Sequence, residues 1–107
     1  MDEDRARRLA LNEAIARDVN NAVGEIAADW HADHERISLI CECSLESCSE
    51  RIHVTLPEYG EVRRHPNRFL VVDEHVVEQI EQRVGSAGDA TVVEKIGPGR
   101  DVAEATA

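Results

Sequence analysis

Three cysteines lie close together in a chain of 107 residues that contains no other cysteine. They form the pattern Cys-x-Cys-x4-Cys, at Cys41, Cys43 and Cys48. Cysteine thiolates are common ligands of Zn²⁺, which takes four ligands in a tetrahedron at structural sites. Because an odd number of thiols cannot pair off completely within one chain, the pattern favours a metal over disulfides. The sequence therefore predicts a zinc site.

The fourth ligand is expected to be a histidine, and the chain has five. They are His31, His34, His53, His65 and His75. His75 is favoured because it follows a predicted strand, at a junction from which a side chain can reach a neighbouring hairpin tip. His53 alternates with apolar neighbours, which is typical of a solvated strand position. The predicted site is Cys3His, formed by the three cysteines and His75, with another histidine as the open alternative.

A long helix is predicted from about Glu3 to about Asp29. Apolar side chains recur along it at spacings of three and four: Leu11, Ile15, Val19, Ala22, Ile26 and Trp30. Such spacing places them on one stripe of a helix. The helix would be roughly 40 Å long, which is long for so small a domain. Two interpretations are open: the stripe packs along the chain's own sheet, or part of it meets another chain, including a second copy in a homodimer.

The cysteines are predicted to lie at the tip of a hairpin. Alternating apolar residues indicate two strands, at about 37–41 and 51–55, that flank the cysteine loop. Thr55 and Glu58 then have the spacing of a capping box, which begins a short helix that ends by His65, before a proline.

The rest of the chain is predicted to supply two more strands and one more helix. The strands are at about 69–72 and 91–96. Between them, Asp73 is expected to cap a helix that carries Val76, Ile80 and Val84 and ends at Gly85. Residues 97–107 are expected to be a disordered tail. The predicted fold is one α+β domain over residues 1–96, with a long N-terminal helix packed on a small, mainly antiparallel sheet, two short helices and a zinc knuckle at a hairpin tip.

Composition narrows the classes of function. The net charge is −10, which disfavours a general nucleic-acid binder because phosphate would be repelled. No apolar stretch is long enough for a signal peptide or a membrane span, so a cytoplasmic protein is expected. A basic run of Arg63, Arg64 and Arg68 stands out against this acidic background. It is either a weak site for an acidic segment of a partner protein or an ordinary solvated helix end.

Enzymatic activity is not the favoured interpretation. Four protein ligands leave no open position on zinc for a water molecule. Glu42, Glu46 and Glu50 lie near the cysteines, but glutamates are too abundant here for this to identify a catalytic base. The function predicted is a small zinc-stabilised protein-interaction or regulatory module. The alternative is a thiol redox sensor that releases zinc when its cysteines are oxidised.

Several segments also resemble a family of proteins. They are Asn12–Ala14, Asp18–Asn20, Cys41–Glu50, Thr55–Tyr59, Val62–Arg63, Pro66–Phe69, Val71–His75 and Val92–Lys95. Together they are similar to a small actinobacterial family of uncharacterised proteins, over most of residues 5–96. The family usually has glycine where Ser44 stands and a Pro-Gly pair where Asp73 and Glu74 stand. The resemblance implies a shared zinc-type fold and no particular activity.

Overall fold

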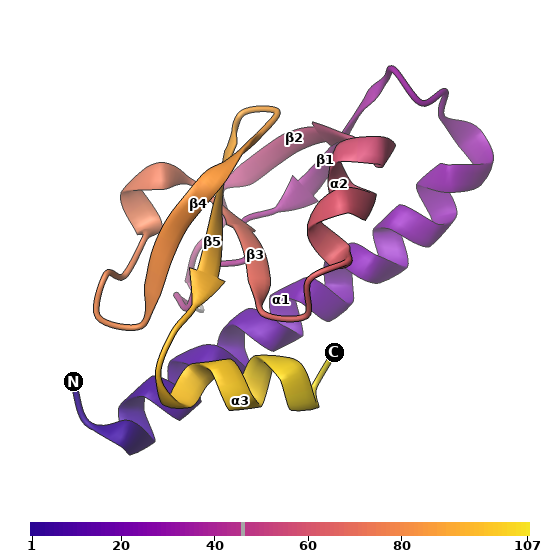
Figure 1. Cartoon of the computed structure of the whole chain (residues 1–107). Helices are drawn as coiled ribbons and strands as arrows, with labels where there is room; N and C mark the ends of the chain where they lie inside the picture. The colour runs from indigo at the N-terminus through magenta and orange to yellow at the C-terminus, as the bar shows by residue number, and fades with distance from the viewer. Residues whose placement is uncertain (46) are drawn as a thin grey trace.

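A computed structural model describes residues 1–45 and 47–107. Its elements are α1 (Glu3–Trp30), β1 (Arg36–Ile40), β2 (Arg51–Thr55), α2 (Leu56–Arg63), β3 (Arg68–Val71), a 3-10 turn (Asp73–His75), β4 (Glu81–Ala87), β5 (Ala90–Lys95) and α3 (Pro98–Ala105). Both sheets are antiparallel, one with β1 and β2 and the other in the order β3-β5-β4. In Figure 1 the long helix α1 runs along one side of both sheets. The predicted α+β fold is confirmed, as is the long N-terminal helix.

The apolar stripe of α1 faces outward. Leu11, Ile15, Val19, Ile26 and Trp30 are between 45% and 80% exposed. The interpretation that this stripe packs on the chain's own sheet is therefore wrong. The helix instead buries its opposite face, where small side chains allow close approach. The buried residues there are Ala6, Ala10, Glu13, Ala14, Ala16, Arg17, Asn20, Gly24 and Ala27.

The C-terminal segment is helical, so the disorder predicted for residues 97–107 is wrong. Pro98 occupies the first turn of α3, where its missing N–H costs no hydrogen bond. A side chain at Gly99 would come within 3.2 Å of the Ala10 methyl group, so α3 lies directly against α1. The buried Arg17 of α1 donates hydrogen bonds to the Ala103 carbonyl and the Thr106 hydroxyl at the end of α3. A cation is favourable at that end of a helix.

The helix predicted after Asp73 is also wrong. Only the short 3-10 turn forms there, and the chain continues into β4, which pairs with β5. A two-residue turn, Gly88-Asp89, joins these strands, and Gly88 has a φ of 55°, which glycine adopts without strain. A bulge between Arg83 and Gly85 leaves Val84 partly exposed on the surface. Strand β4 covers the edge of β5 that β3 leaves open, so the backbone groups on both sides of β5 are paired within the sheet.

The capping box predicted at Thr55 is confirmed. The Thr55 hydroxyl accepts a hydrogen bond from the Glu58 N–H, and the Glu58 carboxylate accepts one from the Thr55 N–H. The cap turns the chain from β2 into α2, which packs over the first of two hydrophobic cores. That core contains Ala27, Ile37, Leu39, Ile52, Val54, Tyr59, Val62, Leu70, Ala87, Ala90 and Val92. The second core contains Cys41, Cys43, Phe69, Val71, Val93 and Ala103, so the cysteine loop is anchored in packed structure.

No helix in the described ranges has both the length and the apolar character that crossing a bilayer requires.

Candidate metal centre

The cysteine loop begins where β1 ends. The Cys41 N–H donates to the Glu50 carbonyl at 3.1 Å, as the last pairing of the β1–β2 hairpin. The next N–H, of Glu42, donates instead to the Leu70 carbonyl of β3 at 2.8 Å. The chain thus leaves its hairpin partner and crosses to the second sheet. Since alternate residues of extended chain point to opposite sides, Cys41 and Cys43 share one side and Glu42 takes the other.

Side chains of α1 hold this crossing in place. The Asn20 side chain makes two hydrogen bonds to the backbone of Ile40. The Asn20 amide oxygen accepts from the Ile40 N–H at 2.9 Å, and the Asn20 amide nitrogen donates to the Ile40 carbonyl at 2.8 Å. Asn12, two turns earlier, donates to the Ser44 carbonyl at 3.1 Å. The long helix therefore positions the loop through hydrogen bonds as well as through packing.

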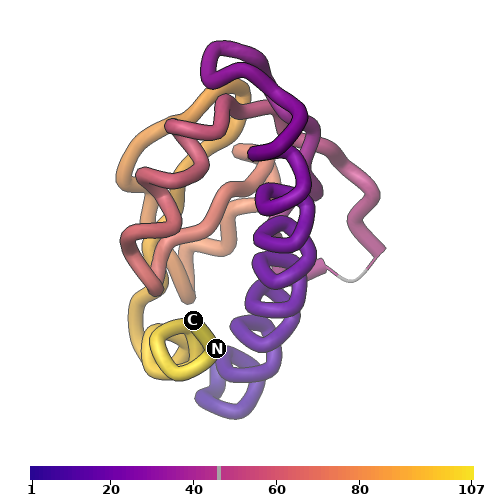
Figure 2. Tube along the Cα trace, turned by 90° about the vertical axis from the view of Figure 1, so that its right-hand side faces the viewer, coloured from indigo at the N-terminus to yellow at the C-terminus, as the bar shows by residue number. Residues whose placement is uncertain are grey.

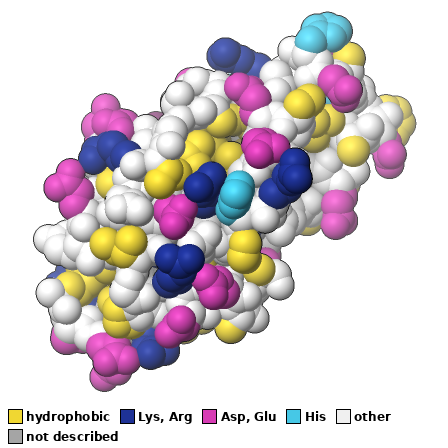
Figure 3. Space-filling model, in the orientation of Figure 1, with side chains coloured by type: hydrophobic (Ala, Val, Ile, Leu, Met, Phe, Trp, Pro, Cys, Tyr) yellow, Lys and Arg dark blue, Asp and Glu magenta, His cyan; other side chains and the backbone are white. Residues whose placement is uncertain are grey.

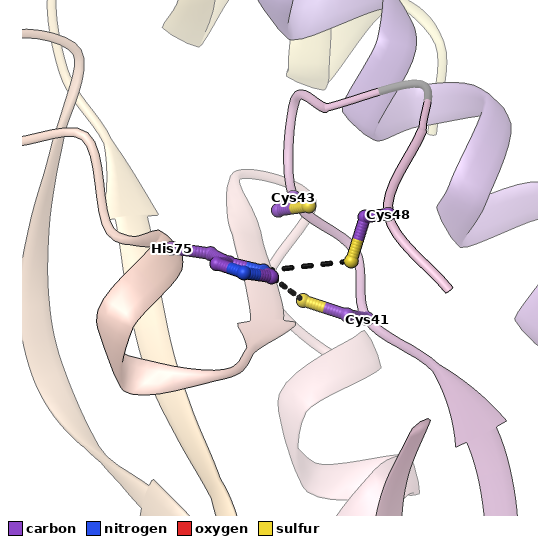
Figure 4. A group of neighbouring side chains, drawn as sticks. All are labelled: Cys41, Cys43, Cys48 and His75. Carbon is purple, nitrogen blue, oxygen red and sulfur yellow. Dashed lines mark hydrogen bonds between the residues drawn. The ribbon is translucent and has the colours of Figure 1, made fainter. Parts of the chain in front are cut away.

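The fourth residue arrives from a different part of the chain. His75 ends the 3-10 turn after β3, and its N–H donates to the Val72 carbonyl at 2.8 Å. On the other side of the site, the Cys48 N–H donates to the Leu45 carbonyl at 3.1 Å, which returns the loop toward β2. Figure 4 shows the His75 ring reaching from its turn toward the sulfur atoms of Cys48 and Cys41.

The four side chains meet in one small cluster. The His75 Nδ1 atom lies 3.4 Å from the Cys48 sulfur and 3.6 Å from the Cys41 sulfur. The four ligand atoms, including the Cys43 sulfur, all lie within 4.8 Å of one another. Around a tetrahedral ion, a thiolate sulfur and an imidazole nitrogen are separated by roughly 3.6 Å. The residues present thus fit one metal ion with three sulfur ligands and one nitrogen ligand.

A backbone group supports the cluster in a way that the sequence did not indicate. The Val72 N–H donates to the Cys41 sulfur at 3.2 Å. Such bonds fix the orientation of a thiolate ligand and stabilise its negative charge. Val72 follows β3 directly, so one short segment supplies both this donor and His75. No side-chain pattern could reveal it, because any residue except proline carries the N–H.

In the absence of a metal, the pKa values of the three thiols are shifted in different directions. A hydrogen bond from Cys41 lowers the pKa of Cys43 to about 5. The same hydrogen bond, together with burial, raises the pKa of Cys41 far above that of a free thiol. Burial also raises the pKa of Cys48. A metal ion that takes all three as thiolates must therefore displace protons.

Glu42 has a structural role on the far side of the loop. Its side chain is fully buried and accepts hydrogen bonds from the Leu70 N–H at 2.9 Å, the Arg63 guanidinium at 2.6 Å and the Asn20 amide at 2.8 Å. The carboxylate thus joins α1, α2 and β3 directly behind the cysteines. It faces away from them, which follows from its place between Cys41 and Cys43. Glu46, the middle of the three nearby glutamates, lies outside the described residues.

The alternative histidine ligands are not part of the cluster. Within the described chain, His75 is the histidine that groups with the three cysteines. His53 lies on β2. Its Nδ1 atom is 2.8 Å from the carboxylate of Asp89, a residue of the β4–β5 turn. The geometry thus agrees with the favoured ligand set.

The three arginines considered for partner binding have different surroundings. Arg63 points inward to Glu42 and lies over the Tyr59 ring. Arg68 pairs with Glu94 at 3.0 Å, whereas Arg64 is 75% exposed and 3.3 Å from Glu61. On the side of the molecule that Figure 3 draws, basic and acidic side chains are interspersed. Arg64 is the most available of the three, and binding of an acidic segment there stays a prediction.

Comparison with known proteins gives no further identification. No protein-family model, curated protein or solved structure matches the chain.

Proposed function

We propose that this chain is a small zinc-stabilised module that acts by binding another protein, in a regulatory role. The observation that carries the proposal is the exposed apolar stripe of α1, which lies beside the Cys3His cluster. Monomeric proteins rarely leave contiguous large apolar side chains in water without a binding role. The metal would hold the loop that borders this surface.

Zinc is the metal that the donor set favours. Three thiolates and one imidazole are soft and borderline ligands, and at tetrahedral sites they favour Zn²⁺ over Mg²⁺ or Ca²⁺. With four protein ligands, no position is left for a reactive water molecule, so the role of the ion is structural. A reducing, cytoplasmic compartment would keep the cysteines available as ligands.

The interaction surface extends from α1 onto the cysteine loop. A groove of about 330 Å³ lies between them, lined by Ile15 and Val19 of α1, by Leu45 of the loop and by the three cysteines. Leu45 is 52% exposed. Because the loop forms one wall, loss of the metal would alter the surface that a partner contacts. The metal and the binding function are linked in this way.

The resemblance to the actinobacterial family is consistent with this proposal. Its segments include Asn12 and Asn20, which bind the loop, and the residues of the cluster itself. We propose that the chain belongs to that family and that these residues serve the same metal-held loop in its members.

The metal assignment predicts a difference between two histidine variants. Protein purified under reducing conditions should contain about one zinc ion per chain by elemental analysis. His75→Ala should bind zinc at least tenfold more weakly, because even the loss of a residue that only supports a ligand commonly costs about 10–100-fold in affinity. His53→Ala should keep wild-type affinity, since His53 lies at the Asp89 turn. Equal zinc affinity in both variants would show that His75 is not a ligand.

The binding function is tested by matched surface variants. Tagged wild-type protein is used to capture partners from an extract of the source organism. The variants Ile15→Asp and Val84→Asp are tagged and used in the same way. Ile15 is 63% exposed on the stripe and Val84 is 40% exposed on β4, so both variants place a charge at an exposed apolar site. A partner retained by Val84→Asp but lost with Ile15→Asp, and then bound as a purified protein, would support the proposal. Equal retention of every captured protein would contradict it.

One observation favours the redox sensor as a second function. The groove reaches the cysteines, and Cys48 is partly exposed, so a small oxidant has access. Hydrogen peroxide would oxidise two thiolates to a disulfide, take up two protons and yield two water molecules. The metal would then lose two ligands. Stoichiometric zinc release at low peroxide, with the fold loosened at the hairpin, would favour this function; retention of zinc would exclude it.

A further inference from the structure

The exposed stripe of α1 is complementary to itself in one orientation. Helix α1 is 28 residues long, and its large apolar side chains are distributed about a centre between Asn20 and Asn21. A second copy laid antiparallel across this centre would place Leu11 opposite Trp30 and Ile15 opposite Ile26. A two-fold axis makes both halves of such a contact identical. The apolar face would then be covered along roughly 30 Å.

Charge along the helix selects the antiparallel orientation. From Asp18 to Glu35 the chain carries five acidic residues and no lysine or arginine. The exposed basic residues of α1 lie near its start, at Arg5 and Arg8, whereas Arg17 in the middle of the helix is buried. Two acidic residues near the start of α1 already have partners within the chain: Asp2 caps the helix and Glu3 pairs with Arg7 at 2.8 Å. An antiparallel neighbour brings arginines to acidic residues, whereas a parallel one brings like charges together.

The end of α1 also lacks a cation of its own. The last turn contains no basic residue, although the carbonyl groups at a helix C-terminus favour one. In the antiparallel pair, Arg8 of the second copy lies near this end, close to Asp29 and Asp33. One side chain would therefore neutralise the acidic residues and the helix end.

A groove lies beside the stripe, between α1 and the cysteine loop. It is lined by Ile15, Val19 and Leu45, so it opens on the side of α1 that would face the neighbour. Ile26 and Trp30 of the second copy would pass over Ile15 and Leu11, next to this opening. Trp30 is 80% exposed in the single chain, the most exposed of the large apolar side chains in the described residues. Figure 2 shows the cysteine loop lying beside α1, on the side away from β4 and β5.

We propose that the occupant of the α1 stripe is a second copy of this chain, bound antiparallel to form a symmetric homodimer. This deepens the proposed function, on which it rests, by naming the partner of the same surface. The dimer places two metal-held loops on one continuous assembly. Each loop lies beside the middle of the paired helices, so a change at either cluster reaches the contact between the copies.

The experiment uses purified, zinc-loaded protein alone. Sedimentation velocity from about 1 to 200 µM should show a concentration-dependent change from monomer to dimer. Trp30 is the single tryptophan, so its fluorescence should shift to shorter wavelength over the same range. Ile15→Asp should raise the dissociation constant at least tenfold, because it would bury a charge against Ile26. Val84→Asp should leave the constant unchanged.

Arg8 tests the orientation. Arg8→Glu should raise the dissociation constant severalfold, and adding Asp29→Arg should restore it, if opposite ends of α1 meet. A parallel dimer would not be weakened by Arg8→Glu, since Arg8 would then face its own copy. A folded, zinc-loaded protein that stays monomeric at the highest concentration overturns the inference, as does a dimer insensitive to Ile15→Asp. Either result leaves the zinc content and the capture of another protein to be judged separately.

Discussion

Cys41→Ser is expected to abolish stoichiometric zinc binding and to lower the melting temperature by roughly 15–30 °C. A ligand present at about a thousand times its dissociation constant stabilises the folded state by about 4 kcal/mol. In a domain of this size each kcal/mol corresponds to about 4–8 °C. Cys41 is 5% exposed, accepts a hydrogen bond from the Val72 N–H and belongs to the second core, so its replacement would remove a proposed ligand from packed structure. Thermal unfolding and elemental analysis of the same samples measure both effects.

Two controls separate loss of the metal from other effects of the substitution. Ser47→Ala changes an exposed residue of the same loop and should leave both zinc content and melting temperature unchanged. Wild-type protein treated with a strong chelator under reducing conditions should melt near the temperature of Cys41→Ser. If Cys41→Ser keeps one zinc per chain, or if the chelator changes nothing, the three cysteines and His75 do not form a metal centre.

Lys95→Met is expected to lower the free energy of unfolding by about 3–5 kcal/mol, because it breaks a buried ion pair. This effect is separate from the cysteine cluster, which is far from Lys95 in sequence. Lys95 is the only lysine of the chain and is fully buried. Its ammonium group contacts the carboxylates of Glu13 on α1 and Glu81 on β4, the latter at 2.6 Å. Both glutamates are also buried. Methionine preserves most of the volume but leaves carboxylates without a cation, and chemical denaturation would measure the loss.

Glu13→Gln should be far milder, with a cost below about 1 kcal/mol. Burial raises the pKa of Glu13 well above its usual value; the Lys95 ammonium lowers it in part, and the neighbouring Glu81 carboxylate raises it again. Glutamine resembles the protonated form. If Glu13→Gln were as destabilising as Lys95→Met, the carboxylate of Glu13 would have to be charged in the folded protein.

The pH dependence of Lys95→Met gives a second check. When the folded state raises the pKa of a carboxyl group, it binds more protons than the unfolded state, so stability falls as pH rises. The raised pKa of Glu13 has this sign, and removal of the ammonium should raise it further. The stability lost in Lys95→Met should thus be smaller at acidic pH than at neutral pH. A loss independent of pH would contradict the assignment.

Local patterns in the sequence predicted the parts of the site that short segments determine. The cysteine spacing places three thiols in one loop whatever surrounds it, and the Thr55–Glu58 capping box forms between neighbouring residues. The choice of His75 was also predicted, because it follows a buried strand at a junction. The Val72 N–H and the inward position of Glu42 were not, since they depend on how the loop crosses to β3.

Tertiary packing decided which face of α1 is buried. The stripe from Leu11 to Trp30 is the most apolar face by sequence, yet the helix buries the face with Glu13, Arg17 and Asn20. Small alanines on that face let α3 approach closely, and its polar side chains find partners: Lys95 for Glu13, the α3 end for Arg17, and the Ile40 backbone for Asn20.

The amino-acid sequence by itself therefore determined the long helix, the hairpin and the candidate ligands, because each depends on neighbours along the chain. Only the tertiary structure decided that β4 is a strand, that α3 is ordered and that the apolar stripe faces outward. These outcomes depend on partners distant in sequence. Strand β4 pairs with the edge of β5, α3 packs on the alanine face of α1, and buried ion pairs and hydrogen bonds hold the polar side chains of that face. A polar side chain is buried where such partners satisfy it, and periodicity alone carries no information about them.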